Sequence, residues 1–336
     1  MKIFVDAMGG DLAPQAPVEG AIEALRRYPQ IEVVLAGVIP EIEKYLVNCD
    51  DVRSRIELLD APEVITNEES PVMGVRRKVN SATVKGMLAL RNKEVDGFVS
   101  AGSTGAVLAG GMFRLGRIPG IERPALAPML PNGKGYVLLI DCGANVDCKP
   151  EYLVQFGLMG DAYMRGVMGI ENPRVGLINI GAEAEKGNAL VKETYPLMEK
   201  APYNFVGNVE ARDVMADTAD VMVADGFAGN LILKNTEGVA MALLKIIKGE
   251  MMADTRGKIA GLIGKPAFKR VKKLMDYTEV GGAPLLGVQG AVVKAHGSSN
   301  AHAFSCAIGQ LIKMVDGKVV EIIEKGVESL APAQSE

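Results

Sequence analysis

Apolar runs alternate along this chain with amphipathic segments, and the alternation predicts strands interleaved with helices. Short apolar runs have the length of buried strands, whereas apolar residues spaced three and four apart predict helices. The predicted strands cover residues 2–6, 31–36, 56–59, 96–100, 125–130, 136–141, 174–180, 203–206, 220–224 and 290–295. The predicted helices cover residues 17–27, 41–47, 72–93, 104–114, 150–168, 187–199, 230–252 and 299–325. This order predicts an α/β fold in which helices cover both faces of a mostly parallel sheet.

Five short polar loops each follow one of these apolar runs. They read DAMGGD at 6–11, SAGSTG at 100–105, DCGAN at 141–145, GAEAEKGN at 181–188 and DGFAGN at 225–230. A loop of this composition between a strand and a helix offers backbone N–H groups to an anion. Several such loops in one chain predict a crevice for a phosphate-bearing ligand at the strand ends.

Composition and charge favour a soluble enzyme. The chain has 336 residues, 48% of them hydrophobic, and we expect a single elaborated domain over 1–330 with a flexible tail over 331–336. The net charge of −4 argues against nucleic-acid binding by the chain as a whole. No apolar run approaches the ~20 residues of a membrane span. The N-terminus reads as a first strand and not as a signal peptide, so we expect a cytoplasmic protein.

The inventory of metal ligands is small. The chain has two histidines and four cysteines, and the cysteines do not have metal-site spacing. We therefore expect reduced thiols, no metal site and no cofactor.

One segment departs from the overall charge. Residues 245–276 carry nine basic and three acidic residues, with apolar residues between the charges. Two interpretations remain open. The segment is a solvated helical hairpin whose apolar face packs on the body or on a second subunit, or it is a surface for an acidic partner or an anionic membrane. Both hold if the hairpin protrudes from a dimer.

Eight sequence blocks occur in an order that resembles one enzyme family. They are DAMGGD at 6–11, SAGSTGA at 100–106, GIERPALAPMLP at 120–131, DCGANVDCKPEYLVQFGLMG at 141–160, GNVEARD at 207–213, DGFAGN at 225–230, GGAPLLG at 281–287 and KAHGSS at 294–299. Together they resemble the bacterial phosphate acyltransferases of phospholipid synthesis, the acyl carrier protein:phosphate transacylases, from residue 1 to about 325.

The resemblance implies a fold, a reaction and partners. The fold is a three-layer α/β/α architecture similar to isocitrate and isopropylmalate dehydrogenases and to phosphotransacetylase, in a homodimer. The reaction moves a long-chain acyl group from the thioester of acyl carrier protein to inorganic phosphate, giving an acyl phosphate for glycerol-3-phosphate acylation. The resemblance also implies peripheral membrane association, for which residues 250–275 are the natural candidate.

This chemistry sets the requirements for the site. Phosphate is itself the nucleophile, so it must be held beside the thioester carbonyl, and the developing oxyanion needs hydrogen-bond donors. The predicted phosphate-binding residues are Ser103, Thr104, Gly105, Asn145, Gly187, Asn188 and Gly229. The predicted catalytic residues are Lys186, Asn230, His296 and Asp225.

Each catalytic candidate also has a structural interpretation. Lys186 is either the principal positive charge at the phosphate or a solvated loop lysine, and Lys149 is a second possible cation. His296 has two interpretations. It either donates a proton to the departing thiolate or a hydrogen bond to the oxyanion, or it caps the start of the following helix. Asp225 opens the long helix that follows and has a stronger functional claim than Asp6 or Asp141, which we interpret as loop caps.

Two basic clusters could receive the acidic carrier protein or an anionic membrane. The first contains Arg76, Arg77 and Lys78. The second contains Lys265, Lys269, Arg270, Lys272 and Lys273. The alternative for both is a solvated helix face.

Three rival functions follow from the same residues. A phosphotransacetylase acting on coenzyme A thioesters shares the fold and chemistry. A decarboxylating dehydrogenase of the isocitrate type would need a carboxylate cluster for a metal and a nicotinamide site, and the chain has no G-x-G-x-x-G pattern. A non-enzymatic membrane-surface protein would rest on residues 245–276 alone and would leave the strand-end loops unexplained.

Overall fold

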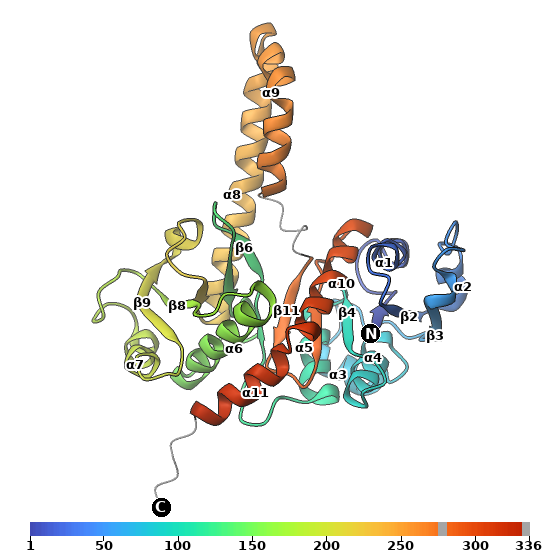
Figure 1. Cartoon of the computed structure of the whole chain (residues 1–336), viewed down its shortest axis with the longest axis horizontal. Helices are drawn as coiled ribbons and strands as arrows, with labels where there is room; N and C mark the ends of the chain where they lie inside the picture. The colour runs from blue at the N-terminus through green and yellow to red at the C-terminus, as the bar shows by residue number, and fades with distance from the viewer. Residues whose placement is uncertain (275–280, 331–336) are drawn as a thin grey trace, which may run out of the picture.

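The computed structural model describes residues 1–274 and 281–330, and its strands form two sheets (Figure 1). The first sheet has the order β3-β2-β1-β4-β12-β11-β5. Its strands are β1 (Lys2–Asp6), β2 (Glu32–Gly37), β3 (Ile56–Asp60), β4 (Gly97–Ser100), β5 (Ala125–Leu126), β11 (Ala283–Leu286) and β12 (Ala291–Lys294). The run from β3 to β12 is parallel, and the pairings of β11 with β12 and with β5 are antiparallel.

The second sheet has the order β6-β7-β10-β8-β9. Its strands are β6 (Met129–Pro131), β7 (Tyr136–Ile140), β8 (Arg174–Asn179), β9 (Asn204–Glu210) and β10 (Val221–Val223). All its pairings are parallel except that of the edge strand β6 with β7. The predicted strand 125–130 is thus divided, because Ala127 and Pro128 pass the chain from the first sheet to the second.

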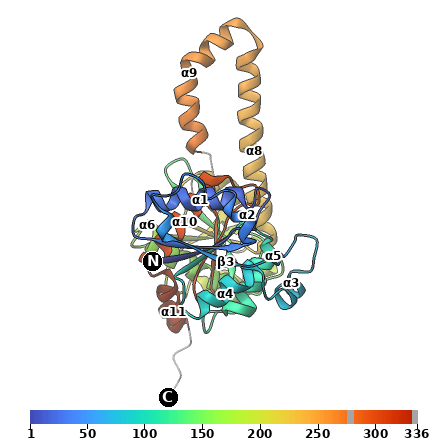
Figure 2. The same cartoon turned by 90° about the vertical axis from the view of Figure 1, so that its right-hand side faces the viewer.

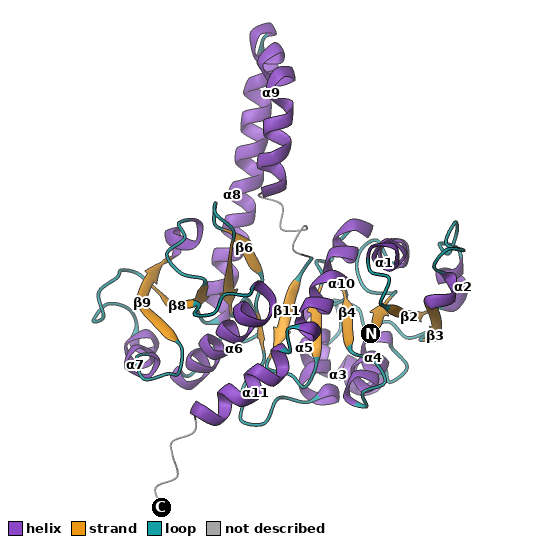
Figure 3. Ribbon diagram, in the orientation of Figure 1, coloured by secondary structure: helices purple, strands orange, loops and turns teal. Residues whose placement is uncertain are grey.

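Helices cover both faces of the sheets, which confirms the predicted three-layer α/β/α architecture with mostly parallel strands (Figure 3). α1 and α10 pack against each other over one face of the first sheet, and α4 packs on the other. The α-helices outside the hairpin, among the described residues, are α1 (Gln15–Arg27), α2 (Ile39–Glu43), α3 (Pro71–Arg77), α4 (Ala82–Arg91), α5 (Thr104–Gly110), α6 (Pro150–Met168), α7 (Ala189–Met198), α10 (Ala301–Asp316) and α11 (Val319–Leu330).

Two predicted helices are each divided in the structure, and one strand was not predicted. The predicted helix 72–93 is two helices, because Ser81 interrupts it and caps α4 by accepting a hydrogen bond from Val84 N. The predicted helix 299–325 is likewise α10 and α11, which are separated at Gly317 and Lys318. The sequence did not predict strand β11, because its run APLL follows Gly281 and Gly282 and contains Pro284, and these residue types indicate a turn.

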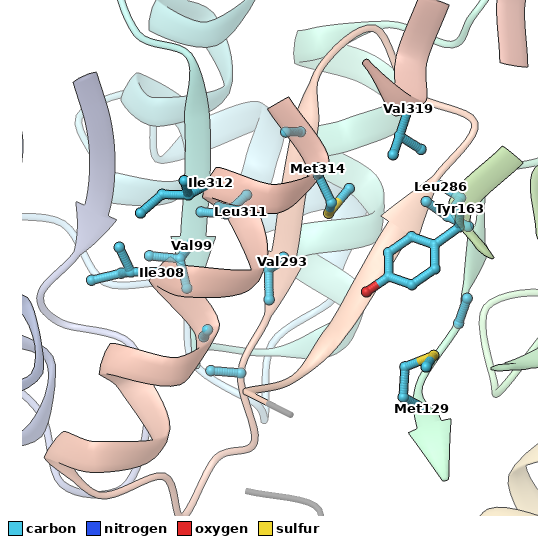
Figure 4. Close-up of a cluster of buried hydrophobic side chains, with 14 of the residues drawn as sticks. Val99, Met129, Tyr163, Leu286, Val293, Ile308, Leu311, Ile312, Met314 and Val319 are labelled. Atoms are coloured by element: carbon cyan, nitrogen blue, oxygen red, sulfur yellow. The ribbon is translucent and has the colours of Figure 1, made fainter. Parts of the chain in front are cut away.

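Buried apolar residues link the two sheets through the covering helices (Figure 4). Val293 of the first sheet, Met129 of the second and Tyr163 of α6 belong to one buried cluster. The Tyr163 hydroxyl, which would otherwise be an unpaired buried group, accepts a hydrogen bond from Gln310 Nε2 of α10 at 2.8 Å. This packing fixes the strand ends that carry the polar loops.

A long helical hairpin projects from the body (Figures 1 and 2). It consists of α8 (Gly226–Ala253) and α9 (Thr255–Leu274), and it contains most of the basic-apolar segment 245–276. The side chains of Lys272 and Lys273, residues 275–276 and the predicted tail 331–336 lie outside the described residues. Many apolar side chains of the hairpin are exposed, among them Leu262 at 74% and Ile263 at 77%.

Candidate active site

Three parallel strands of the first sheet end at one edge, where their last residues meet. β1 ends at Asp6, β4 at Ser100 and β12 at Lys294. The chain leaves β1 toward β2 and β3 and then returns to the other side of β1 as β4. Such a reversal of strand order opens a crevice beyond the carboxyl ends of the strands, where α/β proteins commonly bind ligands.

A polar cavity of about 560 Å³ lies at this reversal. The loops that follow β1, β4 and β12 line it, together with residues 63–68 and one side chain from α8. Its polar and charged lining includes Asp6, Asp11, Thr83, Ser103, Thr104, Lys234, Lys294 and His296.

A second, more apolar cavity of about 340 Å³ lies where the chain crosses between the two sheets. Leu126, Pro128, Met129 and Leu130 come from the crossing itself, and Leu233 comes from α8. Both cavities share Thr104, Lys234, Lys294 and His296. A cationic boundary therefore separates a polar space from an apolar one.

The start of α8 is built onto the loop after β7. Asp225 caps the helix by accepting a hydrogen bond from Ala228 N at 2.8 Å, and Gly226 N donates to Asn145 O at 2.7 Å. A Cβ at Gly229 would lie 1.9 Å from Asp141 O, so only glycine permits this approach. The observed contact of Asp225 is that of a helix cap, and its functional role stays a prediction.

Because α8 packs closely on the loop after β7, one face of the helix lines the cavities. Asn230, Lys234 and Glu237 are four and three residues apart, so they share a face, and all three line the apolar cavity. The exposed Lys234 pairs with Glu237 at 2.8 Å.

Asp6 holds the strand ends together. Its buried carboxylate accepts hydrogen bonds from Ser100 Oγ at 2.8 Å, from Thr83 Oγ1 at 3.1 Å and from Met8 N at 3.1 Å. Burial raises the pKa of this carboxyl above its ordinary value, and the hydrogen bonds oppose that shift. These contacts agree with the predicted role of Asp6 as a loop cap.

Lys294 is the residue that sequence reasoning overlooked. It is only 9% exposed, and its Nζ donates to Ala295 O at 2.5 Å and to Ala101 O at 3.3 Å. Burial lowers the pKa of its ammonium to about 8, although Asp11 and Asp6 act in the opposite direction. The available signal was a lysine at the end of the apolar run AVVK, since a strand end at this edge faces the crevice.

His296 lies next to Lys294 on the same loop. Its Nδ1 accepts a hydrogen bond from Ser298 N at 3.2 Å and lies 2.8 Å from Ser298 Oγ. This contact assigns the hydrogen of the neutral ring to Nε2. Desolvation and the charge of Lys234 lower the pKa of the imidazole below its ordinary value. The neutral ring is then a hydrogen-bond donor near pH 7.

The structure brings some of the predicted phosphate-binding residues together at the cavities. Ser103 lines the polar cavity and Thr104 lines both. Of the predicted catalytic residues, His296 lines both cavities and Asn230 lines the apolar one. Gly105 has a packing reason to be glycine, because a Cβ there would lie 2.5 Å from Pro71 Cγ.

The remaining predicted residues lie elsewhere. In the described part of the chain, neither cavity is lined by Asn145, Lys186, Gly187 or Asn188. Lys186 follows β8 of the second sheet and pairs with Glu183 at 2.7 Å. Asn188 caps α7 through Val191 N, and Asn145 donates from Nδ2 to Pro124 O. A role of these residues at the phosphate stays a prediction.

One residue of the first predicted docking cluster contacts the wall of the polar cavity. Lys78 donates a hydrogen bond to Val64 O at 2.6 Å and forms an ion pair with Glu69 at 2.6 Å. It therefore stabilises residues 63–68, which line the polar cavity. Arg76 and Arg77 of α3 are exposed. Of the three residues, two are therefore available to a partner and one serves the local structure.

Comparison with known proteins identifies the family. The family described as "Fatty acid synthesis protein" matches residues 1–322. A phosphate acyltransferase of Alkaliphilus oremlandii is 51% identical over 336 residues and covers all of both chains. One from Clostridium novyi is 48% identical over 332 residues, which is 98% of this chain and 99% of the relative. The chain belongs to the phosphate acyltransferase family.

Solved structures show the same fold in more distant proteins. A phosphotransacetylase from Streptococcus pyogenes has a TM-score of 0.61 at 15% identity and covers 96% of this chain and 94% of its own. A putative 4-hydroxythreonine-4-phosphate dehydrogenase from Salmonella typhimurium has a TM-score of 0.51 at 10% identity, covering 94% and 99%. The predicted fold relationship to phosphotransacetylases and dehydrogenases is thus confirmed.

Family membership decides between the rival reaction classes. This phosphate acyltransferase family member is an acyltransferase, and neither a decarboxylating dehydrogenase nor a non-enzymatic surface protein. Among the described residues, no group of three or more His, Cys, Asp or Glu side chains could hold a metal ion. No helix within residues 1–274 and 281–330 is long and apolar enough to cross a membrane.

Proposed function

We propose that this phosphate acyltransferase moves a long-chain acyl group from the thioester of acyl carrier protein to inorganic phosphate. The product is an acyl phosphate that serves the acylation of glycerol 3-phosphate in phospholipid synthesis. The single observation that carries the proposal is the junction of a polar and an apolar cavity at Thr104, Lys234, Lys294 and His296. A reaction between phosphate and a fatty thioester needs those two environments side by side.

The polar cavity supplies the groups that phosphate requires. Lys234 and Lys294 provide positive charge, and Ser103 and Thr104 add hydroxyl donors. Holding phosphate against the thioester carbonyl replaces a bimolecular encounter with an oriented attack. His296 Nε2–H and the Asn230 amide are the donors that we assign to the oxyanion.

The apolar cavity and α8 support a long acyl chain. Beyond the cavity, α8 continues with the exposed apolar side chains of Val239, Leu243 and Ile246. The thioester carbonyl would sit at the cationic boundary while the chain extends into the apolar space. A short acetyl group would leave that space unfilled.

The partners in this proposal are acyl carrier protein, a second copy of the chain and a membrane surface. Arg76 and Arg77 offer exposed positive charge on α3 for the acidic carrier. The hairpin combines exposed apolar residues with basic ones, among them Lys265, Lys269 and Arg270, a combination suited to peripheral binding of an anionic membrane. Its apolar face also suits a homodimer contact.

The test is consumption of palmitoyl-acyl carrier protein by the purified chain, with acyl phosphate trapped as its hydroxamate. Palmitoyl-coenzyme A is run in parallel, and phosphate is omitted from one arm. Turnover that requires both the carrier thioester and phosphate is the expected result. Turnover with the coenzyme A ester alone would move the assignment to a phosphotransacetylase.

A further inference from the structure

We propose that Lys294 is the acid that protonates the departing thiolate when phosphate displaces the carrier. The inference rests on the proposed function, since it assigns one step of that reaction. Lys294 is the last residue of β12, at the strand edge where the chain order reverses. It also lines both cavities. The scissile bond of a thioester bound across the boundary would lie at this side chain.

The hydrogen bonds of Lys294 leave one hydrogen for a substrate. An ammonium group has three N–H donors. Two are used by the carbonyl oxygens of Ala295 and Ala101, and no third partner occurs among the residues that the structure describes. Because backbone carbonyls just beyond the ends of the neighbouring strands β4 and β12 hold the lysine, its Nζ is fixed before substrate binds. Fixed donors avoid the cost of reorganisation during the reaction.

The acidity of Lys294 suits a thiol leaving group. An ordinary thiol has a pKa of about 8.5, and burial lowers the pKa of Lys294 to about 8. Proton transfer is efficient when donor and acceptor are matched near the working pH. An ordinary solvated lysine near pKa 10.4 would be a weaker acid than the thiol it must protonate.

Four charged or titratable groups face Lys294 from the surrounding elements. Asp6 lies at the end of β1 and Asp11 in the loop that follows, and both favour the protonated lysine. Lys234 reaches it from α8 and disfavours that form. His296 follows on the same loop, where the charge of Lys294 helps to lower the pKa of the imidazole. Burial is the largest influence on Lys294 and decides the direction.

The neighbouring groups are less suited to this step. His296 has a lowered pKa, so its ring is mostly neutral near pH 7 and serves better as an oxyanion donor. Lys234 is exposed and paired with Glu237. Burial raises the pKa of the Cys142 thiol well above its ordinary value. Lys294 alone among these groups combines burial, a fixed position and matched acidity.

The step balances as follows. A phosphate oxygen forms a bond to the thioester carbonyl carbon, and the carbonyl electrons move to oxygen. When they return, the C–S bond breaks and the sulfur takes the bonding pair. A proton passes from Lys294 Nζ to that sulfur, giving acyl phosphate, free thiol and a neutral amine. The amine then takes up a proton from water.

The decisive experiment compares Lys294→Arg with wild type across pH. Arginine keeps the positive charge but does not titrate below pH 12. We expect KM for phosphate to change by less than about threefold, while kcat falls by about 10²-fold, the lower end of what proton donors contribute. The wild-type kcat should decline above pH 8 as Lys294 loses its proton, and the variant should lack this decline.

A second measurement distinguishes the loss of a proton donor from a disturbed substrate-binding site. Wild type and Lys294→Met are compared on the palmitoyl thioesters of acyl carrier protein and of thionitrobenzoate, whose thiolate leaves without protonation. If Lys294 is the acid, the defect of the variant shrinks at least about tenfold with the second substrate. Lys234→Met is the matched control, because it removes a lysine from the same cavities. It should raise KM for phosphate and keep the alkaline decline.

Each outcome has a defined meaning. Equal defects on both thioesters, or a Lys294→Arg enzyme with wild-type kcat and pH profile, would overturn the assignment while the proposed function stands. If wild type uses only the coenzyme A ester, the same comparison is made with that substrate and decides the role of Lys294 there. If a folded wild type uses neither ester, the proposed function and this inference both fall.

Discussion

The Asp6 carboxylate accepts a hydrogen bond of 2.8 Å from Ser100 Oγ, which ties together the ends of the parallel strands β1 and β4. This contact closes the floor of the polar cavity, because both loops that leave these strands line it. The same carboxylate also holds Thr83 and Met8. The crevice therefore depends on one buried side chain with three partners.

Replacement of Asp6 should destabilise the protein strongly. Asp6→Ala leaves the buried Ser100 and Thr83 hydroxyls without their acceptor, and we expect a loss of about 2–4 kcal/mol in the free energy of unfolding. Urea denaturation measures this loss. Asp60→Ala is the control, since Asp60 also ends a strand of this sheet but is exposed. It should change stability by less than about 0.5 kcal/mol. If the two substitutions lower the free energy of unfolding equally, the hydrogen bonds of the buried Asp6 do not stabilise the fold as described.

Gly229 should tolerate no side chain. A Cβ at this position would meet Asp141 O at 1.9 Å, so Gly229→Ala must displace α8 from the loop after β7. Because α8 carries Asn230 and Lys234, we expect activity to fall by at least about tenfold together with stability. Gly238→Ala in the same helix is the control, because nothing lies near its Cβ position. It should add about 0.5–1 kcal/mol through helix propensity. Thermal melts and initial rates test both variants.

Lys294→Met should stabilise the protein at neutral pH while it lowers turnover. The folded-state pKa of about 8 lies below the unfolded value of 10.5. The unfolded chain therefore binds more protons between these pH values, and stability rises with pH there. Below pH 8 the buried charge costs up to about 3 kcal/mol, at about 1.4 kcal/mol per pKa unit. The gain of the variant over wild type in urea denaturation should shrink from pH 7 to pH 9.5. A gain that does not change with pH would contradict this account.

Lys186 and Lys234 are the two candidates for the exposed lysine that binds phosphate together with the buried Lys294. Lys234 lines both cavities, whereas Lys186 pairs with Glu183 beyond β8. We expect Lys234→Met to raise KM for phosphate by about tenfold, the value of one charge-assisted contact. Lys186→Met should change it by less than about threefold. The hydroxamate assay measures KM for phosphate in both variants. If Lys186→Met raises this KM more than Lys234→Met does, Lys186 is the principal phosphate ligand.

The exposed apolar side chains of α9 should govern membrane binding. Leu262 and Ile263 are both more than 70% exposed, so replacing both with glutamate should leave the fold intact. We expect the double variant to lose co-sedimentation with vesicles that contain anionic lipid. Val47→Glu, at a 63% exposed position outside the hairpin, is the control and should still sediment. If the double variant still sediments but becomes monomeric in gel filtration, the hairpin serves dimer contact.

The sequence determined the features that depend on neighbouring residues. The period of apolar residues located most helices and strands, including α6 at residues 150–168. Glycine and short polar residues marked the loops after β1, β4, β7, β8 and β10, because backbone turns and caps require those residue types. The order of eight sequence blocks identified the family, and the comparisons confirm it.

Only the tertiary structure decided which loops meet. The five loops look alike in sequence, yet Ser103 and Asn230 reach the cavities and Lys186 does not. The loop of Lys186 follows β8, which lies beyond β10 from the edge strand β6 where the chain crosses between the sheets. The importance of Lys294 was hidden for the same reason. Its neighbours Asp6, Ala101 and Lys234 lie far from it in the chain, and a pKa responds to neighbours in space. Local pattern fixes the elements, whereas long-range packing fixes the site.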